Sequence, residues 1–183
     1  MPLRMLRVRG LGAVMDYSQY KGINIGSGPH YAEGWWNTDI IPTDSGKQPD
    51  QLIDIYDFAK TYPEKAFAKA YVGHVLEHIT WDDLPSAIQN IAHIAEKVMV
   101  VGPCIDKATT NMEPQSLLDA IRADENPEDH PWGHKWTPTE LLTVEAIMDA
   151  GFTPHVVSVL TVKRPEWPNP SNATWQTAMW FTP

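Results

Sequence analysis

Short apolar runs alternate with glycine-rich or acidic turns in the first half of the chain. Their length and content predict strands at residues 22–25, 35–41, 51–55, 69–72 and 97–101. The run from Lys97 to Val101 is apolar on both faces, which is typical of a central strand in a parallel sheet. Gly102-Pro103 is expected to end that strand.

Two later segments have helical spacing. Asp82 is expected to cap a helix that has Pro85 in its first turn. Its apolar positions recur every three or four residues, at Leu84, Ile88, Ile91 and Ala95. The capping box Thr137-Pro138-Thr139-Glu140 predicts a second helix that ends at Ala150-Gly151. Its expected apolar positions are Leu141, Val144 and Met148.

Strands that alternate with helices predict an α/β domain whose mostly parallel sheet has helices on both faces. Residues 155–162 and 174–181 are expected to close it as two strands of a hairpin, joined by the proline-rich segment 164–172. Residues 105–136 break the alternation, with a short helix at 114–121 and then a polar stretch. We expect this excursion to be a mobile lid over the carboxyl end of strand 97–101, where open α/β sheets bind ligands.

Composition narrows the class of protein. A length of 183 residues indicates one domain. Residues 1–20 are expected to form a lead-in segment that packs on this domain. A net charge of −9 disfavours a general role in binding duplex nucleic acid. The single cysteine, Cys104, excludes an internal disulfide and fits a reducing, cytoplasmic location. No uninterrupted apolar window is long enough for a membrane span.

The strongest candidate for a binding site is Gly26-Ser27-Gly28, directly after the first strand. Two glycines allow a tight turn and a close approach of a ligand to the backbone, although glycine pairs also end many strands as plain turns. Asp39 and Asp54 end the next two predicted strands, and a carboxylate there can accept hydrogen bonds from a ribose diol. Tyr31 replaces the third glycine of a dinucleotide motif, which favours a nucleoside without a pyrophosphate over a nicotinamide cofactor.

Three segments together resemble the class I S-adenosylmethionine-dependent methyltransferases, most closely a compact branch with a shortened first crossover. They are residues 21–29 (KGINIGSGP), residues 34–40 (GWWNTDI) and residues 74–78 (HVLEH). The resemblance implies a Rossmann-like seven-stranded sheet in the order 3-2-1-4-5-7-6, with the last strand antiparallel. It also implies S-adenosylmethionine as cofactor. Enzymes of this family that methylate the bases of nucleic acids carry an Asn/Asp-Pro-Pro-Tyr motif. Residues 73–76 of this sequence do not match that motif, which counts against a nucleic-acid substrate.

The resemblance also implies roles for individual residues. Gly26, Ser27 and Gly28 would face the methionine part of the cofactor, and Asp39 the ribose, with Ile40 beside it. Asp54, Ile55 and Tyr56 would lie by the adenine, and His74 near the methyl group. The methyl acceptor is expected to be a small molecule, with specificity carried by the excursion at residues 105–136.

Two histidines are candidate catalytic bases, because a neutral imidazole accepts a proton near neutral pH. His74 follows a strand directly, whereas His134 lies in the excursion. An alternative is a zinc hydrolase, since His74, Glu77 and His78 match a pattern that binds zinc on a helix. A third possibility is a module that binds a nucleoside cofactor without catalysis.

Overall fold

One mixed sheet forms the centre of the molecule. The computed structural model describes residues 15–44, 46–107, 135–136, 138–157, 167–168 and 176–183. In these residues the strands are β1 (Ile23–Ile25), β2 (Trp36–Asp39), β3 (Gln51–Leu52), β4 (Ala70–Gly73), β5 (Val98–Pro103), β6 (His155–Val157) and β7 (Gln176–Phe181). Their order is β3-β2-β1-β4-β5-β7-β6, and β7 is antiparallel to both β5 and β6, which confirms the expected topology.

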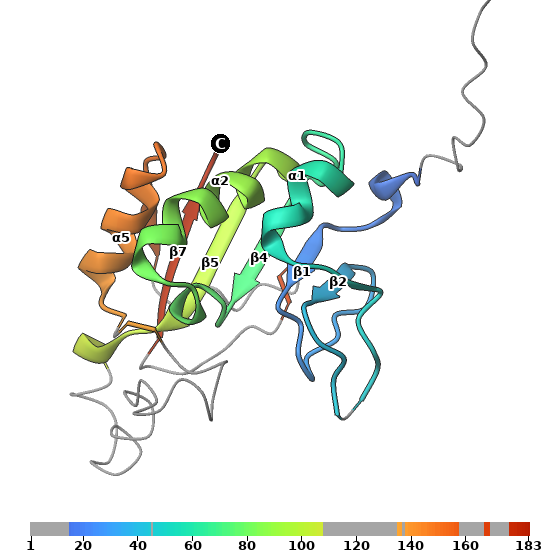
Figure 1. The fold of residues 1–183 in the computed structure, drawn as a ribbon, viewed down its shortest axis with the longest axis horizontal. Coiled ribbons are helices and arrows are strands. Elements are labelled where there is room, and N and C mark those ends of the chain that lie inside the picture. Colours follow the sequence, from blue (N-terminus) through green and yellow to red (C-terminus); the bar gives the residue numbers. More distant parts are fainter. Residues whose placement is uncertain (1–14, 45, 108–134, 137, 158–166, 169–175) are drawn as a thin grey trace, which may run out of the picture.

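The described helices share one face of the sheet. They are α1 (Phe58–Thr61), α2 (Leu84–Ile94) and α5 (Glu140–Asp149), and all three lie in front of the strands in Figure 1. Short 3-10 turns connect the elements: η1 (Tyr17–Gln19), η2 (Ile55–Asp57), η3 (Leu76–His78) and η4 (Trp81–Asp83). The sheet therefore carries its described helices on one side.

Side chains alternate between the two faces of the sheet, as a pleated strand requires. Val72 and Val100 pack with the helices in the main core, whereas Tyr71 and Met99 point to the opposite face. Trp167 covers this second face as a buried side chain next to Tyr71. Within the described residues, Trp35, Tyr71 and Trp167 thus form a second, aromatic cluster on this face.

Several predicted strand ends differ from the observed ones by one to three residues; β2, for example, ends at Asp39 and not at residue 41. Two of these differences have a structural cause. The third strand was expected to reach residue 55, but β3 ends at Leu52 because the Asp54 side chain accepts a hydrogen bond from the Tyr56 backbone (3.0 Å) and starts η2. The fifth was expected to stop at Gly102-Pro103, but β5 includes both residues because they pair with the start of β7.

Both helix starts were predicted too early. Asp83, not Asp82, precedes α2, because η4 occupies residues 81–83. The cap of α5 is Thr139, whose hydroxyl accepts a hydrogen bond from Leu142 N (3.0 Å), so Pro138 lies outside the helix.

The buried face of α5 was predicted correctly at Val144, which packs against the core, and incorrectly at Leu141 and Met148. Leu141 and Met148 are 73% and 59% exposed, whereas Ala146 and Ile147 are buried against the core. The side of α5 that packs on the core therefore contains Val144, Ala146 and Ile147. In α2 the predicted stripe is confirmed, because Leu84, Ile88 and Ile91 are all buried.

The end of the lead-in packs on the domain. Tyr17 contacts Trp36 and Phe67, at ring separations of 5.7 and 4.8 Å. Residues 1–14, the expected helix at 114–121 and the expected strand residues 158–162 and 174–175 lie outside the described part. Among the described helices, none has the length and apolar character needed to cross a membrane.

Candidate functional site

A pocket of about 790 Å3 lies at the carboxyl ends of β1, β2 and β4. This volume is typical of sites for small molecules and cofactors. The residues expected to bind a cofactor all line it: Gly26, Ser27, Gly28, Asp39, Ile40, Asp54, Ile55, Tyr56 and His74. The strand order places Asp54 and Asp39 at one end, called here the carboxylate end. At the other, called here the histidine end, lie His74, Glu77 and Gln176.

The glycine turn forms the floor between the two ends. Gly26 and Gly28 have left-handed backbone angles, with φ of +67° and +46°, which glycine adopts without strain. A Cβ on Gly26 would also lie 2.3 Å from Cγ2 of Val75, so a larger residue cannot fit there without movement. A Cβ on Gly28 would meet no atom within 4 Å. The turn is therefore closed behind Gly26 and open at Gly28.

Ser27 carries a buried polar atom that has no protein partner. The side chain is 2% exposed, and its hydroxyl oxygen makes no hydrogen bond. Leaving such a group unpaired is costly, so it marks a place where a ligand can supply the missing partner. Its backbone N–H donates to Thr38 O (3.0 Å), which holds the turn against β2.

Asp39 joins the glycine turn to the end of β2. One carboxylate oxygen accepts a hydrogen bond from Gly28 N (2.8 Å), and the other accepts from Ile40 N (2.8 Å) and Ile41 N (3.3 Å). A carboxylate has about four acceptor positions, so capacity remains for a hydroxyl donor from the pocket. The same side chain thus shapes the turn and can receive a ligand.

Beneath the carboxylate end lies a polar network that the sequence reasoning missed. Asn24 donates to the side-chain oxygen of Asn37 (2.9 Å), and the amide of Asn37 in turn donates to Asp50 (3.1 Å). Asn24 also donates to His30 O (3.2 Å), which fixes the segment that follows the glycine turn. Two buried asparagines on neighbouring strands were the available signal, because asparagine is depleted in strands.

Asp54, Ile55 and Tyr56 form the outer wall of the carboxylate end. Ile55 is buried, while Asp54 and Tyr56 are exposed. Desolvation, with the nearby Asp83 and Asp54 charges, raises the pKa of Tyr56 above its ordinary value. Its phenol therefore stays protonated at neutral pH and can donate a hydrogen bond.

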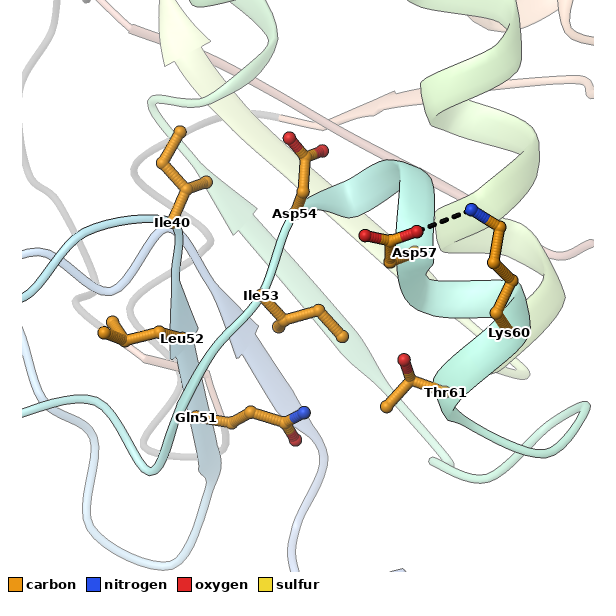
Figure 2. Close-up of a pocket in the computed structure, with 8 residues that line it drawn as sticks. All are labelled: Ile40, Gln51, Leu52, Ile53, Asp54, Asp57, Lys60 and Thr61. Atoms are coloured by element: carbon orange, nitrogen blue, oxygen red, sulfur yellow. Dashed lines mark hydrogen bonds and ion pairs between the residues drawn. The ribbon is translucent and has the colours of Figure 1, made fainter.

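A second hollow of about 700 Å3 lies outside this wall, between β3 and α1. Figure 2 shows Ile53 pointing toward α1, Leu52 pointing away from it, and the ion pair between Asp57 and Lys60 (2.6 Å) on the rim. The hollow shares only Ile40 and Asp54 with the pocket. It lacks the glycine turn and the histidine, so we place the candidate site in the first pocket.

The histidine end combines a strained residue with a buried carboxylate. His74 has a φ of +56°, which is uncommon for a residue with a side chain and occurs often at functional sites. Its backbone N–H donates to Val101 O (2.8 Å), and its Nδ1 lies 3.2 Å from Oε1 of Glu77. Glu77 is only 2% exposed. Sequence reasoning listed Glu77 only as a zinc-site residue and missed the third member, Gln176, whose amide nitrogen contacts Nε2 of His74.

Tyr71 also lines the pocket, and burial raises the pKa of its phenol to about 12. The phenol is thus a hydrogen-bond donor and not a base at neutral pH. The described histidines that line the pocket are His30, His74 and His78, and an imidazole is suited to accept a proton near neutral pH. His30 follows the glycine turn and His78 lies in η3, whereas His74 directly follows β4.

The helical zinc motif is not formed. His74 has a left-handed backbone and precedes the 3-10 turn η3, so His74 and His78 do not share one face of a helix. No group of three or more potential ligand side chains in the described residues is arranged to hold a metal ion. His134 and most of the excursion, residues 108–134, lie outside the described part.

Solved structures provide the comparisons, since no family model and no curated protein matches the sequence. A SAM-dependent methyltransferase from Archaeoglobus fulgidus matches 92% of this chain over 88% of its own length, with a TM-score of 0.57 and 12% identity. An S-adenosylmethionine-dependent methyltransferase from Mesorhizobium loti matches 93% over 94%, with a TM-score of 0.52 and 14% identity.

The methyltransferase SibL matches 93% of this chain with a TM-score of 0.55 and 12% identity, but the chain spans only 52% of its length. At these identities the likeness concerns the fold. The strand order, the antiparallel β7 and the pocket at the carboxyl edge agree with it. The chain has the fold of the class I S-adenosylmethionine-dependent methyltransferases.

Proposed function

We propose that the protein binds S-adenosylmethionine in the pocket and catalyses transfer of its methyl group. The observation that carries this proposal is the position of both ends of the pocket on one sheet edge. Asp39 ends β2 and His74 follows β4, two strand spacings or roughly 10 Å apart. One nucleoside-containing ligand can therefore contact the carboxylate and the histidine together.

The residues present fit this cofactor. The unpaired hydroxyl of Ser27 and the open space at Gly28 suit the amino-acid part, which carries charged donors and acceptors. Asp39 can accept from the ribose hydroxyls, and Ile55 with Tyr56 supplies an apolar wall with one donor for the adenine. When bound, the cofactor supplies a methyl group activated by a positively charged sulfur.

The protein's own part is to hold the acceptor and manage its proton. His74 lies at the pocket end farthest from Asp54, where an imidazole nitrogen can take a proton from a hydroxyl or amine. We extend the proposal to a small-molecule acceptor and a cytoplasmic location, which the net charge of −9 and the single cysteine support. His134 stays a second predicted base.

Calorimetry with S-adenosylhomocysteine tests the binding step. Wild type should bind it, and Asp39→Ala should lose about 1.5–3 kcal/mol of binding free energy, or about 10- to 150-fold in Kd. Asp57→Ala is the matched control, because Asp57 is an exposed carboxylate of the second hollow. Equal affinities for all three proteins would contradict the proposed site.

A second stage tests transfer. Wild type is incubated with methyl-labelled S-adenosylmethionine and a pool of small hydroxyl and amine compounds, and products are identified by mass spectrometry. The proposal predicts at least one methylated product. Tight binding of S-adenosylhomocysteine with no methylated product would instead favour a module that binds the cofactor without catalysis.

A further inference from the structure

Three side chains from separate parts of the chain meet at the histidine end. His74 follows β4, Glu77 lies in η3 behind it, and Gln176 begins β7. The His74 side chain is 37% exposed and lines the pocket, whereas that of Glu77 is 3% exposed. The imidazole thus stands between the pocket and a buried carboxylate.

Both contacts of the imidazole agree on one tautomer. Nδ1 lies 3.2 Å from Oε1 of Glu77, which is ion-pair distance without hydrogen-bond geometry, and the negative charge of the carboxylate favours the proton on this nitrogen. The amide nitrogen of Gln176 is a donor, so Nε2, which it contacts, presents a lone pair. A neutral His74 with its proton on Nδ1 places a positive edge toward Glu77 and a lone pair toward the Gln176 amide nitrogen.

Glu77 is buried, which strengthens its electrostatic interaction with the His74 ring. A carboxylate removed from water is costly unless it is paired. Oε1 has no hydrogen-bond partner among the described residues, and Nδ1 of His74 lies 3.2 Å from it. A positive charge that develops on the imidazole would therefore be stabilised directly by Glu77.

The surrounding structure holds the backbone of the turn that carries Glu77. The backbone oxygen of Glu77 accepts from Lys135 N (2.7 Å), and Leu76 O accepts from the indole of Trp136 (3.1 Å). Trp136 packs edge-on against Trp81, at 5.4 Å between rings. The end of the excursion is thus fastened to the turn that carries Glu77.

We propose that Glu77 is a positioning residue that keeps the proton of His74 on Nδ1 and so presents Nε2 as the proton acceptor for the methyl acceptor. The inference rests on the proposed function and narrows its substrate class to neutral nucleophiles that carry a proton, with an O–H or N–H group. In this structure the amide N–H of Gln176 donates to Nε2 of His74. We expect the O–H or N–H group of the methyl acceptor to take the same position. Oε1 of Gln176 is buried without a hydrogen bond and can receive a second donor from the same acceptor.

The step balances without a further reactant. The acceptor's oxygen or nitrogen uses a lone pair to bond to the methyl carbon, and the carbon–sulfur bond pair stays on sulfur. The acceptor's proton moves to Nε2 of His74, giving an imidazolium next to the Glu77 carboxylate. Loss of that proton to solvent restores the neutral ring.

The tautomer can be measured in the free protein by NMR of the imidazole nitrogens at mildly alkaline pH. The spectrum of His74→Asn assigns the His74 signals. We expect Nδ1 of His74 to show the shift of a protonated ring nitrogen and Nε2 that of an unprotonated one. In Glu77→Gln the two tautomers should mix, while Glu33→Gln, an exposed control, should leave the spectrum unchanged. A proton on Nε2 in the wild type would overturn the proposal whether or not any variant folds.

Cofactor binding separates this proposal from the proposed function. Glu77→Gln should bind S-adenosylhomocysteine within about threefold of wild type. With a methylated acceptor from the screen, its kcat should fall on the order of 10²-fold or more, with a smaller change in KM. If wild type fails to bind S-adenosylhomocysteine, the proposed function is wrong. If it binds and methylates an acceptor while Glu77→Gln keeps full kcat, only the role of Glu77 is wrong.

Discussion

The two ends of the pocket are built in different ways. At the carboxylate end, Asp39 accepts a hydrogen bond from Gly28, which is eleven residues earlier in the sequence. Asp54 caps η2, which begins at the next residue. At the histidine end, the ring of His74 contacts Gln176 from 102 positions away, and its buried partner Glu77 lies beneath it. The first end depends on backbone turns and the second on side chains that the sheet brings together. Substitutions at the carboxylate end should therefore change stability and cofactor binding, whereas substitutions at the histidine end should change proton transfer.

The largest effect is expected at the glycine turn, where two glycines with similar backbones can be compared. Gly26→Ala should lower the free energy of unfolding by about 2–4 kcal/mol, since the new Cβ meets Val75 at 2.3 Å and φ is +67°. Gly28→Ala has only the strain of a φ of +46° and should cost about 1–2 kcal/mol. Urea unfolding measures both, and equal losses would show that Val75 does not close the turn.

A smaller effect on binding, without a loss of stability, is expected for Ser27→Ala. The hydroxyl has no partner in the free protein, so its removal should not lower the free energy of unfolding. Affinity for S-adenosylhomocysteine should fall by about 0.5–1.5 kcal/mol, or about 2- to 10-fold, measured by calorimetry. Ser86→Ala, at an exposed position in α2, is the control. A stability loss with unchanged affinity would mean that Ser27 is only structural.

The smallest effect concerns the anchor of the histidine end. Lys107 lies 2.6 Å from Glu140 and 3.3 Å from Thr177, the residue after Gln176. The hydrogen bond from Lys107 lowers the pKa of Glu140, so the pair stabilises the fold above the ordinary glutamate pKa and this contribution is lost as the pH falls through the lowered value. Both side chains are about one-third exposed, which limits the gain to below about 1 kcal/mol.

Lys107→Met therefore should lower the free energy of unfolding slightly at neutral pH and not at strongly acidic pH. Chemical unfolding at the two pH values measures the difference. A deficit that persists in acid would show that Lys107 stabilises by packing and not through the charge of Glu140.

The contrast between the two ends also explains what the sequence could predict. Turns and strand ends have local residue preferences, so the sequence could predict the positions of Gly26, Gly28 and Asp39. The strand order was predicted from the family resemblance. Gln176 could not be found, because its contact with His74 depends on the register of β7 against β5. The prediction of the buried face of α5 was wrong at Leu141 and Met148 for a similar reason, because the spacing of apolar residues alone does not show which of them contact the core. Asp54 lines the pocket, but it caps the 3-10 turn η2 and does not end a strand.

The most direct test of the account is a crystal structure of the protein with S-adenosylhomocysteine. The account predicts ribose hydroxyls on the Asp39 carboxylate, the amino-acid part against Ser27 and Gly28, and the sulfur directed toward His74 and Gln176. A nucleoside bound instead in the hollow between β3 and α1, or a ligand in the pocket with its sulfur turned away from His74, would contradict it.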